Sequence, residues 1–220
     1  MIKIKNLSYT FKNGRELFSD INFSINDGEI LMIKGLSGRG KSTLLDILAG
    51  LKDNNKGDIY FNNHLFSNFS KGAKASFRMN NIAYLRQGIF FFNHLNIFEN
   101  ILFQKKFQVK QSHKDLEQAK EKILTLFKVY KLNIALTDSP EHLSGGEKVR
   151  LAVIRAIINE ANYIFLDESL SQLDDCHQEI VLNSLKEKLK DKIKNILIVS
   201  HQEIDHQKCF DLSKVTSILN

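Results

Sequence analysis

The residues best suited to chemistry form a glycine-rich turn that leads directly into a lysine and two hydroxyl side chains. This segment, residues 35–43, reads GLSGRGKST and matches the pattern G-x-x-x-x-G-K-[ST]. Glycines let consecutive backbone N–H groups point at an anion, and the start of a helix adds favourable potential. Lys41 supplies a positive charge to the β- and γ-phosphates, and the Ser42 hydroxyl is a magnesium ligand. We therefore assign nucleotide phosphate binding to Gly35, Ser37, Gly38, Arg39, Gly40, Lys41, Ser42 and Thr43.

Two acids follow an apolar run further along the chain. Residues 163–166 read YIFL and are followed by Asp167 and Glu168. A buried parallel strand delivers such acids to the crevice at its carboxyl end, where α/β sheets bind ligands. Asp167 is then placed to hold magnesium, and Glu168 to act as a general base toward water. The alternative is a strand that runs into an acidic turn.

A third segment, residues 143–147, reads LSGGE. Ser144 and Glu147 have the spacing of a capping box, so a purely structural helix start explains them. A second interpretation is compatible with the first. Gly145 and Gly146 leave backbone N–H groups uncovered at the helix start and open to an anion.

The elements that position these residues alternate between strands and helices. We predict strands near residues 2–7, 21–25, 30–34, 58–61, 82–86, 163–166 and 195–199. We predict helices from about residue 42, over much of 98–132, and near 145–159 and 175–190. This alternation indicates an α/β fold whose sheet is mostly parallel and covered on both faces.

Composition excludes some classes of protein. The net charge is +6, but no arginine-rich block or basic run with interleaved aromatics occurs, so we expect no nucleic-acid partner. Two cysteines give no disulfide framework. The apolar runs are far shorter than the roughly 20 residues that cross a bilayer. We therefore expect a cytoplasmic chain that does not span a membrane.

Together these segments resemble the ABC ATPases, the nucleotide-binding subunits of ABC transporters. Residues 143–147 resemble that family's LSGGQ signature with Glu in last place, and Arg150, Ala152, Arg155 and Ala156 continue the match. Residues 171–174, SQLD, resemble the family's D-loop SALD. The resemblance implies a P-loop NTPase core with an N-terminal antiparallel β-subdomain and an inserted α-helical subdomain at about 88–160. It makes residues 1–220 one such domain.

The resemblance also implies roles for individual residues, with ATP and Mg²⁺ as cofactors. Gln87 matches the glutamine that reaches magnesium and water, and His201 matches the histidine that contacts the γ-phosphate. The ATP held by an opposite subunit would be contacted by the start of the signature helix, at Ser144, Gly145, Gly146 and Glu147. Phe11, or else Tyr9, is placed to stack on adenine. Each of these roles has a structural alternative. For Gln87 and His201 it is an ordinary polar residue at the end of a strand. For Phe11 it is an aromatic that faces the core, and for Asp174 it is the N-cap of the following helix.

Two departures from the family pattern concern turnover. Ser169 stands where a proline usually follows the catalytic glutamate, and Gln172 replaces the small alanine of the D-loop. We expect slow but real hydrolysis and unimpaired ATP binding.

The implied partners are a second ABC ATPase subunit and an integral membrane transporter subunit at the inner face of the cell membrane. The apolar stretch from Gln87 to Phe107 is either subdomain core or a groove for that membrane partner. Arg78, Gln87 and the segment 96–100, NIFEN, resemble the branch that serves lipoprotein release and macrolide or peptide export. The alternatives are a non-transport ABC ATPase of DNA repair or translation, a mechanotransmission ATPase, and a catalytically inactive scaffold.

Overall fold

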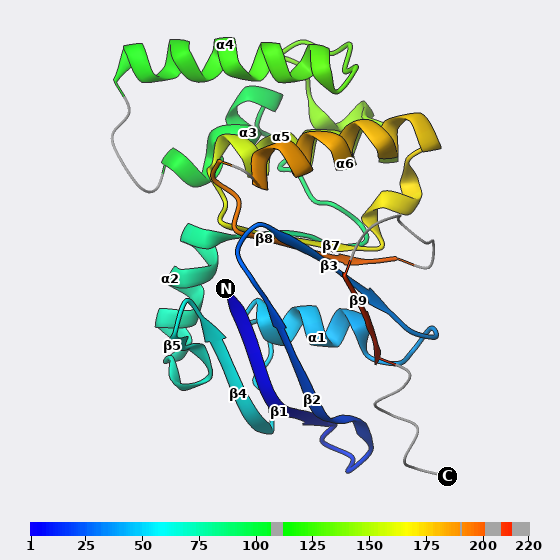
Figure 1. Cartoon of the computed structure of the whole chain (residues 1–220). Helices are drawn as coiled ribbons and strands as arrows, with labels where there is room; N and C mark the ends of the chain where they lie inside the picture. Colours follow the sequence, from blue (N-terminus) through cyan, green and yellow to red (C-terminus); the bar gives the residue numbers. More distant parts are fainter. Residues whose placement is uncertain (107–111, 190, 201–207, 213–220) are drawn as a thin grey trace.

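The N-terminal part of the chain forms a small antiparallel sheet. We describe a computed structural model covering residues 1–106, 112–189, 191–200 and 208–212 (Figure 1). The sheet has the strand order β2-β1-β4-β5. Its strands are β1 (Ile2–Thr10), β2 (Glu16–Ile25), β4 (Lys56–Phe61) and β5 (His64–Leu65).

A second sheet is parallel and carries the predicted phosphate loop and acids. Its order is β6-β7-β8-β3-β9, and every described pairing within it is parallel. Its strands are β3 (Glu29–Lys34), β6 (Ile82–Leu85), β7 (Tyr163–Asp167), β8 (Asn195–Val199) and β9 (Lys208–Asp211). Since parallel strands end at one common edge, residues that follow β3, β6 and β7 gather at that edge.

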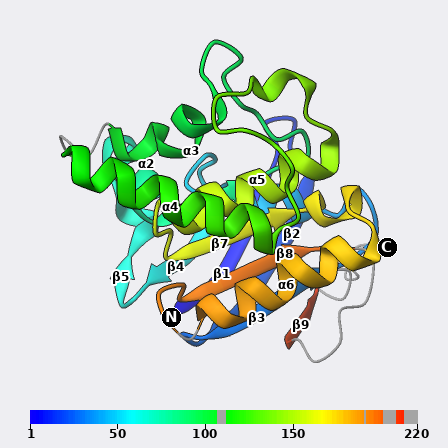
Figure 2. The ribbon, with the colours of Figure 1, turned by 90° about the horizontal axis from the view of Figure 1, so that it is seen from above.

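Helices cover both faces of the parallel sheet. Helix α1 (Lys41–Leu48) lies between the two sheets, and α2 (Lys71–Asn81) packs beside β6. The other face is covered by α3 (Ile97–Lys106), α4 (His113–Val129), α5 (Gly145–Ile158) and α6 (Asp175–Leu189), as Figure 2 shows from above. Short 3-10 turns within the described residues include Phe66–Asn68, Pro140–His142 and Ser169–Gln172.

Alternation along the central strands divides the hydrophobic core in two. On β8, Ile196 and Ile198 join the cluster under α3–α6, whereas Leu197 and Val199 join the cluster around α1 and the antiparallel sheet. Successive strand residues point to opposite faces, so a strand covered on both faces is apolar throughout. This explains why the predicted strands 163–166 and 195–199 read as continuous apolar runs.

The α/β architecture agrees with the prediction, and several elements differ in extent. β2 begins at Glu16, and β5, β9 and α2 were not predicted. The helical stretch predicted over 98–132 is two helices, α3 and α4. A capping box between Ser112 and Asp115 starts α4 afresh, because each side chain satisfies a backbone N–H at the helix start.

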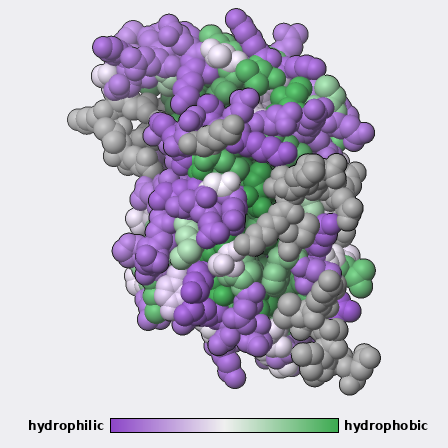
Figure 3. All heavy atoms as spheres, in the orientation of Figure 1, coloured by the Kyte–Doolittle hydropathy of each residue, from purple (hydrophilic) through white to green (hydrophobic). Residues whose placement is uncertain are grey.

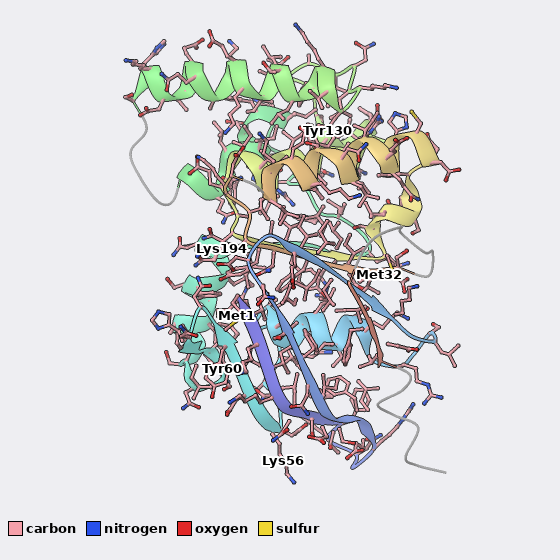
Figure 4. All side chains as sticks on the ribbon, viewed as in Figure 1. Met1, Met32, Lys56, Tyr60, Tyr130 and Lys194 are labelled. Carbon is pink, nitrogen blue, oxygen red and sulfur yellow. The ribbon has the colours of Figure 1, made fainter. Side chains whose placement is uncertain are left out.

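Within the helical layer a buried contact joins the end of α4 to α6, and the outer surface of the layer is hydrophilic. Tyr130, labelled in Figure 4 beside α4 and α6, donates its hydroxyl to Ser184 Oγ at 2.8 Å. Hydrophilic side chains dominate the face in Figure 3. Within the described ranges, no helix combines the length and apolar character needed to cross a bilayer.

Candidate nucleotide-binding site

The phosphate loop connects the end of β3 to the first turn of α1. Gly38 and Gly40 have φ of 76° and 92°, the left-handed region that favours glycine. A Cβ on Gly40 would lie only 2.7 Å from Leu17 Cδ2, a side chain of β2. Glycine is therefore required at position 40 by both backbone conformation and packing, and the loop lies directly against β2.

Lys41 is folded into this loop. Its side chain is buried, and Nζ donates to the carbonyl oxygens of Gly35 and Leu36 at 2.8 and 3.1 Å. The ammonium group therefore lies inside the curl of backbone that the motif predicts for phosphate. Three further residues of the loop, Ser37, Gly38 and Arg39, are exposed.

The first turn of α1 meets the carboxyl end of β7. Ser42 Oγ donates to Asp167 Oδ1 at 2.9 Å, although 125 positions separate the two residues. A hydroxyl and a carboxylate oxygen are the hard ligands that Mg²⁺ prefers, and Mg²⁺ usually takes one or two protein ligands beside substrate phosphates. The pair therefore fits the predicted magnesium site, and Thr43 follows it half-buried.

Asp167 is 4% exposed at this edge. Burial raises its pKa, and the nearby charges of Glu168 and Asp46 raise it further, while hydrogen bonds from Ser42 and Tyr84 act in the opposite direction. Binding of a divalent cation would offset the charge that burial disfavours.

Glu168 leaves the strand in a left-handed conformation, with φ of 53° and ψ of 9°. Its N–H donates to the carbonyl oxygen of Val199 at 3.1 Å, which holds it at the end of β8. A following proline disfavours helical backbone in the preceding residue. Ser169 therefore permits a turn at Glu168 that the family's usual proline would oppose.

The LSGGE segment begins α5 with the predicted capping box. Ser144 N and Oγ donate to Glu147 Oε2 at 2.9 and 2.8 Å, and Glu147 N donates back to Ser144 Oγ at 3.3 Å. The hydrogen bonds from Ser144 hold the pKa of Glu147 below its ordinary value. The structural interpretation is thus correct, and it leaves Ser144 and Gly145 exposed.

The D-loop lies against this helix start. Gln172 Oε1 is 2.8 Å from the position that a Cβ on Gly145 would occupy, and the Gln172 carbonyl oxygen is 3.2 Å from that of Gly146. Asp174 caps α6 by accepting from His177 N at 2.9 Å, as its capping interpretation predicts.

The remaining predicted residues lie around the same edge. Gln87 is exposed two residues after β6, whose Leu85 pairs with Leu166 of β7. Phe11 begins the β1–β2 turn and packs edge-to-face on Tyr9 with ring centroids 5.4 Å apart. Its half-buried ring partly joins the core, as the alternative proposed. His201 lies outside the described residues.

The sequence prediction missed polar residues under the loop. Tyr84 of β6 and Asp46 of α1 lie beside Ser42 and Asp167. One signal was present in the sequence: Asp46 stands four residues after Ser42, on the same side of the helix, and its neighbours in the second half of that helix are apolar.

Known proteins share this arrangement. The profile of the family described as ABC transporter matches residues 18–171. The lipoprotein-releasing system ATP-binding protein LolD of Buchnera aphidicola subsp. Acyrthosiphon pisum (strain APS) is 34% identical over 91% of this chain and 88% of its own length. The ergothioneine transport ATP-binding protein EgtV of Helicobacter pylori (strain G27) is 33% identical over 94% and 93%.

Solved structures agree with the sequence relatives. A dimeric structure of MJ0796, a bacterial ABC transporter cassette, superposes with a TM-score of 0.81 at 27% identity, covering 92% of this chain and 88% of that one. Another dimeric structure of the same cassette, with ADP and Pi in a post-hydrolysis state, gives the same values. The chain belongs to the ABC transporter family, as an ATP-binding and ATP-hydrolysing subunit.

Proposed function

We propose that one chain, a single domain over residues 1–220, holds MgATP at its phosphate loop while a second copy or close relative closes on the γ-phosphate. The observation that carries the proposal is the 2.9 Å contact between Ser42 Oγ and Asp167 Oδ1. It brings the hydroxyl of the phosphate loop and the acid of β7 together as one oxygen-ligand pair.

Each residue has a distinct role in the proposal. Lys41 and the loop N–H groups bind the β- and γ-phosphates, while Ser42 and Asp167 hold Mg²⁺, whose charge neutralises the phosphate oxygens. Glu168 orients and deprotonates the attacking water, for which a positioned general base supplies about 10²–10⁴-fold. Gln87 and His201 complete the polar surroundings of the magnesium and the γ-phosphate.

The second half of the site is the start of α5. It is exposed, begins a 14-residue helix, and carries the N–H groups of a Gly-Gly pair. Helix starts attract anions because their N–H groups lack intrahelical partners. The dimeric MJ0796 cassette supports a partner subunit as the source of that anion.

We further propose that the surface beside Gln87 receives a membrane subunit. Phe91 and Ile97 are buried, whereas Phe90 is 68% exposed. Arg155 holds this segment, since its guanidinium stacks on Phe91 at 4.6 Å.

A groove runs beside this segment between β6, α3 and α5, and Phe103, Gln104 and Asn159 are among the residues that line it. The described part of the stretch, residues 87–104, thus supplies both core and an outward aromatic, which suits docking of a short helix. Such docking places the chain at the inner face of the membrane, and the similarity to LolD supports export-type work.

The test uses Glu168→Gln. With MgATP, the variant should form a stable dimer by size-exclusion chromatography with light scattering, and phosphate release should fall by about 10²-fold or more. Glu179→Gln, an exposed acid on α6, is the matched control and should keep wild-type turnover. An undiminished phosphate release in Glu168→Gln, or a monomer at saturating MgATP, contradicts the proposal.

A further inference from the structure

The hydroxyl of Tyr84 lies between two buried carboxylates beside the proposed magnesium site. Tyr84 Oη donates toward Asp46 Oδ1 at 3.2 Å and toward Asp167 Oδ2 at 3.4 Å. The Ser42 carbonyl oxygen is 3.5 Å away. A phenol has one proton to donate, and both carboxylate distances exceed the usual 2.7–2.8 Å of an O–H···O bond. The proton is therefore shared between the two acids.

Asp46 has its own cations. Its side chain is 6% exposed, with Lys52 Nζ 3.3 Å from Oδ2 and Arg86 Nη2 3.4 Å from Oδ1. Both cations come from the half-exposed rim. Asp46 therefore has charged partners even when the Tyr84 proton lies toward Asp167.

Asp167 is placed differently. Its Oδ1 accepts from Ser42, and its Oδ2 is reached by Tyr84. Lys52 and Arg86 pair with Asp46 instead. The Tyr84 hydroxyl is thus the group that fixes the second oxygen of Asp167, and with it the plane of the carboxylate.

The ring of Tyr84 is held independently of its hydroxyl. It packs edge-to-face on Phe165 with centroids 6.1 Å apart, and the Arg86 guanidinium lies 5.5 Å above it. A phenylalanine at position 84 would keep both contacts. Removal of the oxygen alone is therefore a clean perturbation.

We propose that Tyr84 is a positioning residue for magnesium: its hydroxyl fixes Oδ2 of Asp167, so that Oδ1 stays turned toward the Ser42 hydroxyl, where the metal of MgATP binds. This inference rests on the proposed function of Ser42 and Asp167. Asp46 acts with Tyr84 by orienting the phenol from the α1 side.

The experiment separates metal binding from nucleotide binding. In the Glu168→Gln background, the affinity for ATP is measured by calorimetry with Mg²⁺ and again with EDTA. The ratio of the two affinities is the magnesium gain. Tyr84→Phe should lower the magnesium gain about fivefold, the effect of one ordinary hydrogen bond, because the contact to Asp167 is long and its proton is shared with Asp46. The affinity in EDTA should stay within about twofold.

Tyr60→Phe is the matched control. Tyr60 also donates to an aspartate, Asp58 Oδ2 at 3.2 Å, but on the antiparallel sheet (Figure 4). The Tyr60→Phe variant should leave the magnesium gain unchanged. Thermal unfolding without nucleotide checks that both variants are folded.

The outcomes are distinguishable. An unchanged magnesium gain in Tyr84→Phe, or equal losses with Mg²⁺ and with EDTA, would show that the hydroxyl only fastens β6 to α1 and would overturn the inference. If the parent itself shows no magnesium gain, the proposed function fails, and the inference falls with it.

Discussion

The two halves of the proposed nucleotide site are built in opposite ways. At the phosphate loop, Lys41 and Asp167 are buried, and their polar atoms contact the loop carbonyls and Ser42 within the same chain. At the start of α5, Ser144 and Gly145 are exposed, and the cap is closed by Glu147 of the same helix turn. One half is organised across the whole fold, whereas the other is organised by local sequence.

Because of this difference, we expect the first half to determine nucleotide affinity and the second half to determine dimerisation. The loop half has its charges and ligands in place before any partner arrives, so a single chain is equipped to hold a nucleotide. The helix start offers N–H groups that await an anion from outside. Substitutions in the first half should therefore change nucleotide affinity, and substitutions in the second should change dimerisation while affinity stays constant.

The largest effect is expected from Lys41→Met. It removes the ammonium that the loop encloses but keeps an unbranched side chain in the same space. Loss of charge-assisted hydrogen bonds, each worth about 1.5–3 kcal/mol, should weaken ATP binding roughly a hundredfold or more by calorimetry. Lys56→Met, an exposed lysine at the start of β4, is the control and should bind normally. Normal binding by Lys41→Met would refute the loop half of the comparison.

Gly145→Asp should weaken ATP-dependent dimerisation without changing nucleotide binding at the phosphate loop. An acid in the first helical turn stabilises α5 by a few tenths of a kcal/mol, yet it places a negative charge where the partner's phosphate would dock. Among the described residues, the atoms nearest to the new Cβ belong to the flexible Gln172 side chain. We expect ATP affinity of the monomer within about twofold and a dimer at least tenfold weaker, because like charges repel across an interface.

Gly72→Asp provides the matched comparison for that change. Gly72 is also exposed in the first turn of a helix, α2, and a Cβ there meets no atom of the described residues within 4 Å beyond its own helix backbone. Analytical ultracentrifugation with MgATP in the Glu168→Gln background measures both dimers. If the two variants dimerise equally, the start of α5 is not the face that closes on ATP.

A smaller effect in the same half is expected from Gln172→Ala. The Gln172 amide lies over Gly145, so it must be displaced or immobilised when a phosphate approaches. Immobilising such a side chain costs about 0.5–1.5 kcal/mol, so its removal should tighten the ATP-dependent dimer about two- to tenfold. Gln118→Ala, exposed on α4, should change nothing. A weaker dimer in Gln172→Ala would instead make the amide part of the closed interface.

The same contrast explains what the sequence could predict. The residues of the phosphate loop and of the α5 cap stand in contiguous motifs, so they could be assigned from local pattern, and for the α5 cap that pattern also gives the conformation. The meeting of Ser42 with Asp167 was also predictable, because each follows or ends a strand of one parallel sheet. These parts of the site depend on chain order and strand direction only.

Other contacts depend on side chains from separate elements and were not predictable. The position of Tyr84 between Asp46 and Asp167 requires the register of β6 on β7 and the packing of α1 beneath both. The edge strand β9 has four residues and no strong alternation, and it exists through pairing with β3. The left-handed turn at Glu168 depends on tertiary contacts, because Ser169 is compatible with this conformation but does not require it.

The smallest expected effect concerns the stability contributed by the residue after Glu168. Ser169 is fully buried beside Glu168, and its Oγ has no hydrogen-bond partner among the described residues. Burying an unpaired hydroxyl costs about 1–3 kcal/mol, so Ser169→Ala should stabilise the chain by about 1 kcal/mol and raise Tm by about 2–4 °C in calorimetry. Ser184→Ala is the opposite case, because Ser184 Oγ accepts the Tyr130 hydroxyl at 2.8 Å in the buried helical layer. Its loss leaves the Tyr130 hydroxyl unpaired and should lower Tm. A Tm that falls in both variants would mean that the Ser169 hydroxyl has a partner in solution.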